Sequence, residues 1–332
     1  MSLYLANDNC IHILGRYEEK DGALYFDNVA SGVELDFIGS SISLICKSIP
    51  RPRINKNYPM FTILSAMIDN HNPVELMVEI HNEDFLEVKI ADNLSYSKHH
   101  LILMKTDDPL ISTFVLKGVI AEKIIPFKSN KKKLLIYGDS ITAGGDNTII
   151  AGPSLDVVPG TGIGTYTYAS LFALDLDLDF QVFAQCGMPL ANFTECSDAI
   201  NMREIYKDIS PQNHHKWDMS KFIPDLIMIN LGTNDELGKN YNSQEFITEY
   251  VGFVHDVNNI YKNKTYLLIC GQMNKAEDLV SSIYKVCDIL NKQGIKTFVY
   301  RSKKARRGHP NVFEHRELAN ELISFVKEKV II

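Results

Sequence analysis

The stretch that decides the fold reads KSNKKKLLIYGDSITAGG and covers residues 128–145. Its first six residues are polar or basic, which is typical of a solvated linker. Residues 134–138 then form a nearly continuous apolar run, the pattern of a parallel strand buried on both faces. This run leads directly into Gly138-Asp139-Ser140, so the sequence places a hydroxyl side chain at the carboxyl end of a buried strand.

Downstream of this stretch, apolar runs and helical patterns alternate. Residues 243–262 carry apolar side chains at helical spacing. Asn311, with Glu314 three residues on, is typical of a capping box at the start of a last helix that runs to about Val330. The alternation predicts an α/β domain, a doubly wound, mainly parallel five-stranded sheet with helices on both faces. After residues 134–138, the further strand candidates are 179–184, 225–230, 265–270 and 296–301.

Upstream of the linker, the hydrophobic pattern has a period of two. In residues 33–37, apolar Val, Leu and Phe alternate with Glu and Asp, and residues 42–46 and 86–90 repeat the alternation. Such short runs, separated by turns, are typical of half-buried antiparallel strands. We therefore predict an all-β, jelly-roll-like sandwich domain over residues 1–129 and the α/β domain over residues 130–332. The length of 332 residues also favours two domains, because single cores stop growing at a smaller size.

Composition argues against several classes of protein. The chain has 34 Lys and Arg against 41 Asp and Glu, a net charge of −7, which argues against a nucleic-acid binder. No apolar run approaches the roughly 18 residues of a membrane span. The six cysteines form no C-x-x-C pair, so we expect reduced core residues. Residues 1–16 lack the pattern of a secretory signal, so we expect a cytoplasmic protein, with a secreted mature form left open.

The residues that could carry chemistry follow the predicted strands. Ser140, Gly187 and Asn234 each come shortly after an apolar run, and His309 stands between the fifth strand and the last helix. In open α/β sheets, ligands bind outside the carboxyl ends of the strands, so these residues are expected to converge on one edge. Acyl transfer needs a hydroxyl nucleophile, a base beside it and donors for the oxyanion.

In order and spacing, four blocks of the sequence resemble those of the SGNH (GDSL-type) hydrolases: Gly138-Asp139-Ser140, Gly187, Gly232-Thr233-Asn234-Asp235 and His309-Pro310. With a β-rich domain ahead of it, the layout resembles the two-domain carbohydrate esterase family 2, which includes acetylxylan esterases. The resemblance implies an SGNH-type α/β sheet in which Ser140 is the nucleophile and His309 the base. It also implies an oxyanion hole made by the backbone N–H groups of Ser140 and Gly187 and the side-chain amide of Asn234.

The resulting prediction is a serine esterase, a carboxylic ester hydrolase that removes O-acetyl groups from an oligo- or polysaccharide through a Ser–His dyad and an acyl-enzyme. It requires neither a metal nor an organic cofactor. One alternative is an inactive carbohydrate-binding protein on the same fold. Another is an esterase or thioesterase that acts on lipid-like acyl chains.

The sequence departs from the SGNH pattern at one position. These hydrolases usually carry an Asp three residues before the histidine, and here that residue is Arg306. We therefore expect a main-chain carbonyl or a remote side chain to orient His309. Arg306 and Arg307 belong to the basic loop 301–309, which either is simply solvated or attracts an anionic saccharide. Trp217 is a candidate for stacking against a sugar, or it packs under its loop.

Two histidine pairs invite a metal interpretation, His99-His100 and His214-His215. Neither pair has a carboxylate or cysteine at a ligand-like spacing, and neighbouring strand residues point to opposite faces. We interpret both pairs as solvated loop residues.

Overall fold

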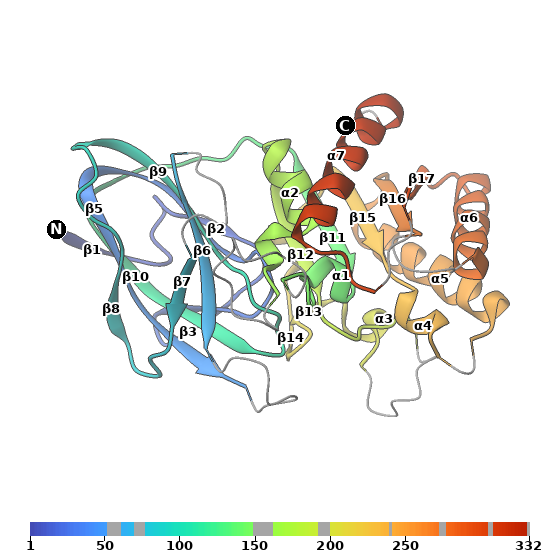
Figure 1. The fold of residues 1–332 in the computed structure, drawn as a ribbon, viewed down its shortest axis with the longest axis horizontal. Helices are drawn as coiled ribbons and strands as arrows, with labels where there is room; N and C mark the ends of the chain where they lie inside the picture. The colour runs from blue at the N-terminus through green and yellow to red at the C-terminus, as the bar shows by residue number, and fades with distance from the viewer. Residues whose placement is uncertain are drawn as a thin grey trace.

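The computed structural model describes residues 1–51, 61–69, 77–148, 162–191, 200–238, 241–271, 277–304 and 308–330. Figure 1 shows two layered parts side by side: an antiparallel β part that holds the N-terminus, and an α/β part that ends with the C-terminal helix. This order confirms the predicted fold class.

The β part is an antiparallel sheet of ten strands that folds back on itself. Its central strand, β5, pairs with β9 along residues 32–39 and with β8 along residues 42–46. The change of partner lies beside Gly39, whose φ of +150° favours glycine. The strands are β1 (Ser2–Leu5), β2 (His12–Leu14), β3 (Glu18–Lys20), β4 (Ala23–Phe26), β5 (Gly32–Pro50), β6 (Thr62–Ile68), β7 (Met77–Ile80), β8 (Leu86–Ala91), β9 (Ser97–Lys105) and β10 (Ser112–Ile125).

The α/β part contains a parallel sheet in the order β12-β11-β15-β16-β17. All five strands fall where the continuous apolar runs predict them. β11, β12, β15 and β16 are buried almost throughout, whereas the edge strand β17 is only partly buried. The strands are β11 (Lys133–Gly138), β12 (Asp179–Ala184), β15 (Leu226–Asn230), β16 (Thr265–Cys270) and β17 (Thr297–Arg301), and the longer helices are α2 (Tyr168–Asp175), α5 (Ser243–Tyr261), α6 (Glu277–Lys292) and α7 (Val312–Lys329). The shorter elements are α1 (Ser140–Ala143), η1 (Gly164–Tyr166), α3 (Met202–Ile205), β13 (Asp208–Ser210), β14 (Asn213–Lys216), η2 (Met219–Lys221) and α4 (Thr233–Glu236).

Alternate residues of β11 face two separate cores. Leu134 and Ile136 belong to the core beneath α2 and α7, whereas Leu135 and Tyr137 belong to the core beneath α5 and α6. The parallel sheet therefore carries helices on both faces, as predicted, and its strand ends are held rigidly by the two cores.

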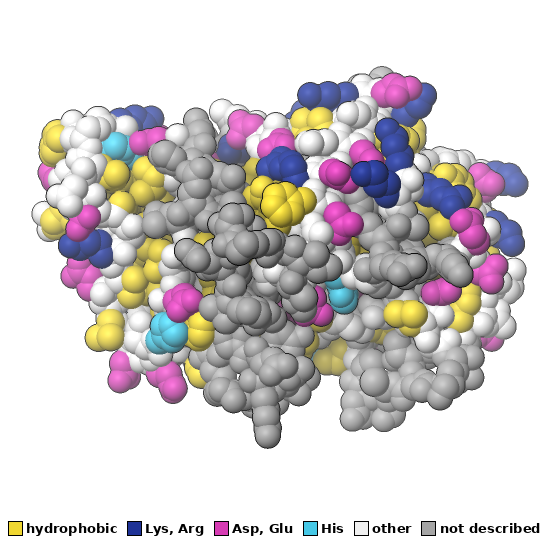
Figure 2. Space-filling view, viewed as in Figure 1, with side chains coloured by type: hydrophobic (Ala, Val, Ile, Leu, Met, Phe, Trp, Pro, Cys, Tyr) yellow, Lys and Arg dark blue, Asp and Glu magenta, His cyan; other side chains and the backbone are white. Residues whose placement is uncertain are grey.

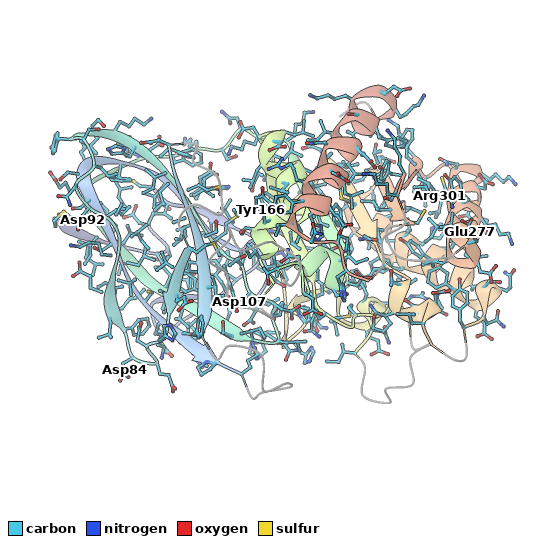
Figure 3. The ribbon with its side chains drawn as sticks, in the orientation of Figure 1. Asp84, Asp92, Asp107, Tyr166, Glu277 and Arg301 are labelled. Carbon is cyan, nitrogen blue, oxygen red and sulfur yellow. The ribbon has the colours of Figure 1, made fainter. Side chains whose placement is uncertain are left out.

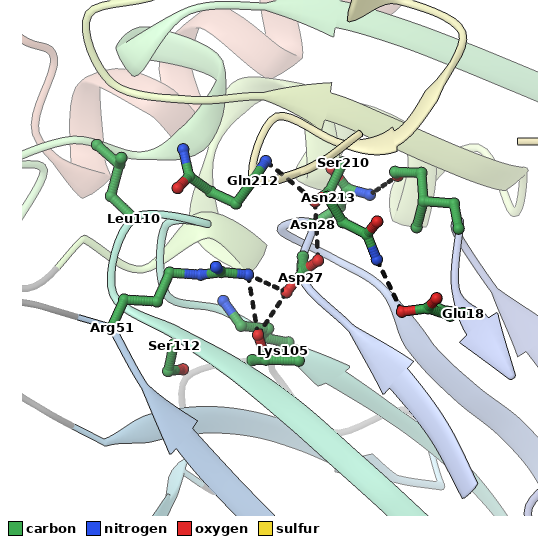
Figure 4. A network of polar contacts seen from close by, with 12 residues as sticks. Glu18, Asp27, Asn28, Arg51, Lys105, Leu110, Ser112, Ser210, Gln212 and Asn213 are labelled. Carbon is green, nitrogen blue, oxygen red and sulfur yellow. Dashed lines mark hydrogen bonds and ion pairs between the residues drawn. The ribbon is translucent and has the colours of Figure 1, made fainter. Parts of the chain in front are cut away.

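Buried polar contacts join the two parts of the molecule. Figure 4 shows Asp27 of the β part accepting hydrogen bonds from Arg51 and from Ser210 of the α/β part. Arg16, which is 1% exposed, reaches across and donates to the carbonyl oxygens of Tyr206 at 2.8 Å and Asp208 at 2.6 Å. These bonds satisfy backbone groups of the α/β part with donors from the β part.

The expected domain boundary after residue 129 falls between the end of β10 and the start of β11. The division into two domains, residues 1–129 and 130–332, stays a prediction. No helix in the described ranges is long and apolar enough to cross a membrane.

The interpretation of His99 and His100 as loop residues was wrong. Both lie in β9, where Nδ1 of His99 is 2.6 Å from a carboxylate oxygen of Asp69 and Nδ1 of His100 is 2.8 Å from one of Asp36. These acidic partners are 30 and 64 positions away, so no local pattern indicates the pairing. His214 and His215 are largely exposed, but they lie in β14.

Candidate active site

Ser140 and His309 form the centre of the site. Ser140 opens α1 at the carboxyl end of β11, and His309 lies in the connection between β17 and α7. Nε2 of His309 is 2.7 Å from Oγ of Ser140. The imidazole is therefore placed to take the hydroxyl proton, as the sequence predicted for a nucleophile and its base.

The expected oxyanion donors come from the two strands that flank β11. β12 leads to Gly187 and β15 leads to Asn234, and Gly138 of β11 is in register with the last residues of both strands. Gly187 has a φ of +77° and is exposed. Across the described chain, neither the Ser140 nor the Gly187 amide donates to another residue. With respect to the residues that the structure describes, both amides are available to an oxyanion.

Asn234 is held by its own hydrogen bond. Its side-chain amide donates to the carbonyl oxygen of Met188 at 3.0 Å. An amide group carries two protons, so the second remains for a ligand. The bond also links α4 to the loop that follows Gly187.

Two buried carboxyl groups, for which the sequence reasoning proposed no role, support this arrangement. Asp139 caps α1 by accepting from the Ile141 amide at 3.0 Å, and Asp235 accepts from the Leu190 and Ala191 amides at 2.9 and 3.0 Å. Burial raises the pKa of Asp139 to about 7 and that of Asp235 to about 6, although these amides favour the ionised forms. Both residues belong to the sequence blocks shared with the SGNH hydrolases, and this membership is the feature from which a role in the site could have been predicted.

The Asp that SGNH hydrolases usually carry three residues before the histidine is Arg306 in this sequence, but the carboxylate of Asp146 lies near His309. Nδ1 of His309 is 3.8 Å from a carboxylate oxygen of Asp146, beyond hydrogen-bonding distance. No residue in the described ranges accepts a hydrogen bond from this nitrogen. Burial lowers the pKa of His309, and the negative charge of Asp146 partly opposes that shift.

Asp146 is fixed beside the histidine by its own loop. It adopts a left-handed backbone with a φ of +54°, uncommon for a residue other than glycine. The next residue, Asn147, accepts at its carbonyl oxygen from the amide of Val312, the first residue of α7, at 3.1 Å. The loop after the nucleophile and the loop that carries the histidine are thereby joined.

Comparison with known proteins agrees with this geometry. Residues 134–304 match the family model described as GDSL-like lipase/acylhydrolase. The chain belongs to this family.

Relatives of this GDSL-like chain include carbohydrate esterases. Cellulase/esterase CelE of Acetivibrio thermocellus is 25% identical over 90% of the chain, which spans 37% of that protein's length. Acetylxylan esterase / glucomannan deacetylase of Cellvibrio japonicus is 22% identical over 96% of the chain and 88% of its own length. A solved family two carbohydrate esterase from Clostridium thermocellum, in complex with cellohexaose, has a TM-score of 0.83 at 22% identity, covering 96% of this chain and 99% of that one. The resemblance inferred from the sequence blocks is confirmed.

The candidate substrate-binding residues of the GDSL-like chain receive less support. Arg306 and Arg307 lie outside the described residues. Trp217 is 6% exposed, with its ring 5.4 Å from that of Tyr17 and the ammonium of Lys221 5.2 Å above it. Its burial favours packing, the alternative that the sequence left open, over stacking against a sugar.

Two cations of the basic loop are already paired with acidic residues. Arg301 pairs with Glu277 of α6, as labelled in Figure 3, and Lys304 pairs with Glu317 of α7 at 3.0 Å. Figure 2 shows basic and acidic side chains interspersed on the described surface of this face. These pairings weaken the case that the loop recruits anionic saccharides.

Proposed function

We propose that the protein is a carbohydrate O-acetylesterase that works through Ser140 and His309 as a dyad. The observation that carries this proposal is the 2.7 Å contact between the serine hydroxyl and the imidazole at the carboxyl edge of the sheet. The names of the two curated relatives, a cellulase/esterase and an acetylxylan esterase / glucomannan deacetylase, support an acetylated plant-type polysaccharide as the substrate class.

In the first half of the reaction, Ser140 attacks the acetyl carbonyl. His309 takes the hydroxyl proton at Nε2 as the bond between Oγ and the carbonyl carbon forms. The amides of Ser140, Gly187 and Asn234 donate to the negative oxygen. The bond to the sugar oxygen then breaks, and His309 returns the proton to that oxygen, which leaves an acetyl-enzyme.

In the second half, water replaces the sugar. His309 takes a proton from water as the water oxygen attacks the acetyl carbon, and the same three donors hold the oxyanion. Collapse of this intermediate releases acetate and returns the proton to Ser140. The neutral form of His309 starts both halves, which suits an imidazole whose pKa is lowered by burial.

The test is acetate release from acetylated xylan, glucomannan and cello-oligosaccharides by the wild type and by Ser140→Ala. We expect the wild type to release acetate and Ser140→Ala to retain below about 1% of that activity, because the nucleophile is lost. Circular dichroism should show the variant folded, since among the described side chains the hydroxyl forms a hydrogen bond only with the imidazole.

Other outcomes would favour the alternatives. Binding of the saccharides without any acetate release would favour a carbohydrate-binding protein. Faster hydrolysis of p-nitrophenyl octanoate than of p-nitrophenyl acetate would favour an esterase for lipid-like acyl chains.

A further inference from the structure

One carboxylate of the β part lies beside the oxyanion loop. Asp108 stands in the connection between β9 and β10, and its Oδ2 accepts a hydrogen bond from the backbone amide of Cys186 at 2.8 Å. Cys186 immediately precedes Gly187. A residue 78 positions upstream thus holds the peptide next to a proposed oxyanion donor.

The Asp108 carboxylate is itself held in place. Its Oδ1 accepts from the Leu110 amide at 2.9 Å, and the Cys186 thiol forms a second contact with the carboxylate. Burial raises the pKa of Asp108, while the two amides and the positive charge of Lys105 favour its ionised form.

The whole connection is attached to the α/β part. The carbonyl oxygen of Thr106 accepts from the Gly164 amide at 2.7 Å, and its hydroxyl accepts from the Thr165 amide at 3.2 Å. The segment that carries Asp108 is therefore held against the α/β part by hydrogen bonds two residues before the carboxylate.

Gly187 has no side chain that could hold it in place. It has a left-handed backbone, it is exposed, and a Cβ built on it would meet nothing within 4 Å. After Gly187, Asp235 fixes the Leu190 and Ala191 amides, and the Met188 amide donates to the Gln185 carbonyl oxygen at 3.3 Å. Before Gly187, Asp108 holds the Cys186 amide.

We propose that Asp108 is a positioning residue for catalysis: by holding the Cys186 amide, the β part sets the direction of the Gly187 N–H toward the oxyanion. This inference rests on the proposed esterase function. It gives the β part a role in the reaction itself. Donors must lie within a few tenths of an ångström of the hydrogen-bonding distance to stabilise the developing charge.

The experiment compares Asp108→Asn with Asp107→Asn in the full chain. An asparagine side chain at the first position can accept only one of the two amide bonds, because its nitrogen is a donor. Asp107 is the matched control: its carboxylate bonds the Ile63 amide, Ser112 and Lys105, all within the β part. Both substitutions replace a carboxyl group by a carboxamide in the same connection.

We expect Asp108→Asn to lower kcat for p-nitrophenyl acetate about tenfold or more with KM within about twofold. Complete removal of an oxyanion donor costs about 10²–10³-fold, and misdirecting one costs part of that. The inhibition constant of phenylboronic acid, whose tetrahedral serine adduct places a negative oxygen in the same hole, should rise by a similar factor. Asp107→Asn should leave both quantities within about twofold of the wild type.

The inference is overturned if Asp108→Asn matches the wild type, or if Asp107→Asn shows the same losses. An inactive wild type would instead refute the proposed function. Should Asp108→Asn fail to fold, hydrogen exchange on the wild type decides: the Cys186 amide should exchange at least about 100-fold more slowly than the Gly187 amide. Equal exchange rates would show that Asp108 does not hold the peptide.

Discussion

His309 stands between two opposing influences, burial and the charge of Asp146. Burial lowers its pKa from the ordinary value of 6.5, and the carboxylate opposes that change. A general base works in its neutral form, so activity is lost as the pH falls through the pKa of the folded enzyme. We expect the acidic limb of kcat/KM for p-nitrophenyl acetate to have its midpoint below 6.5. A midpoint above that value would show that the charge outweighs burial.

A substitution of Asp146 is a second test of the pKa of His309. Asp146→Asn removes the negative charge 3.8 Å from Nδ1, so the pKa of His309 should fall further and the acidic limb should move to lower pH. The plateau of kcat should drop about threefold to tenfold, up to about 1.4 kcal/mol, because the imidazolium formed in the transition state loses its anion. Asp92→Asn, at the far end of the β part in Figure 3, is the control and should change neither quantity. An unchanged profile for Asp146→Asn would remove the electrostatic role.

Sequence reasoning could place the predicted site residues at one edge of the sheet because their positions follow local rules. Ser140, Gly187 and Asn234 each come shortly after an apolar run, and parallel strands bring such positions to one edge. Asp146 could not be assigned in this way. It reaches His309 through a left-handed turn and a bond between Asn147 and Val312, neither of which leaves a pattern in the sequence.

At the scale of elements, α7 follows His309 directly in the chain. Asn311 accepts from the Phe313 and Glu314 amides, and Glu314 accepts in return from the Asn311 amide, which confirms the capping box. The cap residue stands two positions after the histidine and fixes the start of the helix at Val312. It thereby also fixes the length of the connection that carries the imidazole.

Asn311→Ala should lower the free energy of unfolding by about 1 kcal/mol, because two amides of the first turn lose their acceptor. The shift in the urea midpoint, at an unchanged slope, measures this loss. Asn311→Asp keeps an acceptor at the same place and is the matched control, with an expected stability close to that of the wild type. Equal midpoints for all three proteins would show that the cap contributes nothing.

The strands of the two parts differed in how well the sequence predicted them. The parallel strands were found because continuous apolar runs leave few alternatives. In the β part, residues 33–37 and 42–46 looked like two strands, yet both belong to β5, which changes partner without a turn. β9 was obscured by His99 and His100, whose polar side chains are satisfied by carboxylates distant in the sequence.

At the scale of the whole molecule, the contact between the two parts depends on residues that no local rule connects. Arg16 and Tyr206 are 190 positions apart, and Asp108 and Cys186 are 78 apart. Sequence periodicity reports which side of a strand is buried, and it contains no information on which polar group another part will need. The polar contacts between the two parts could therefore not be predicted from the sequence pattern.

Arg16→Met tests how far that contact stabilises the protein. Methionine replaces the aliphatic stem but leaves the Tyr206 and Asp208 carbonyl oxygens without their donor, and it removes the guanidinium that lies 4.6 Å from the Phe183 ring centre. Each unsatisfied buried group costs about 1–3 kcal/mol, so the loss of the donor to two carbonyl groups should lower the free energy of unfolding by about 2–6 kcal/mol.

Trp217, the one tryptophan of the chain, reports on this interface because it packs against Tyr17 of the β part. In Arg16→Met, its fluorescence should change at a lower urea concentration than the far-ultraviolet circular dichroism, since the interface opens before the sheets unfold. Arg203→Met is the control: Arg203 pairs with Glu249 and Asp256 inside the α/β part, so its two transitions should coincide. Coincident transitions and an unchanged midpoint in Arg16→Met would show that the two parts are held together without the guanidinium.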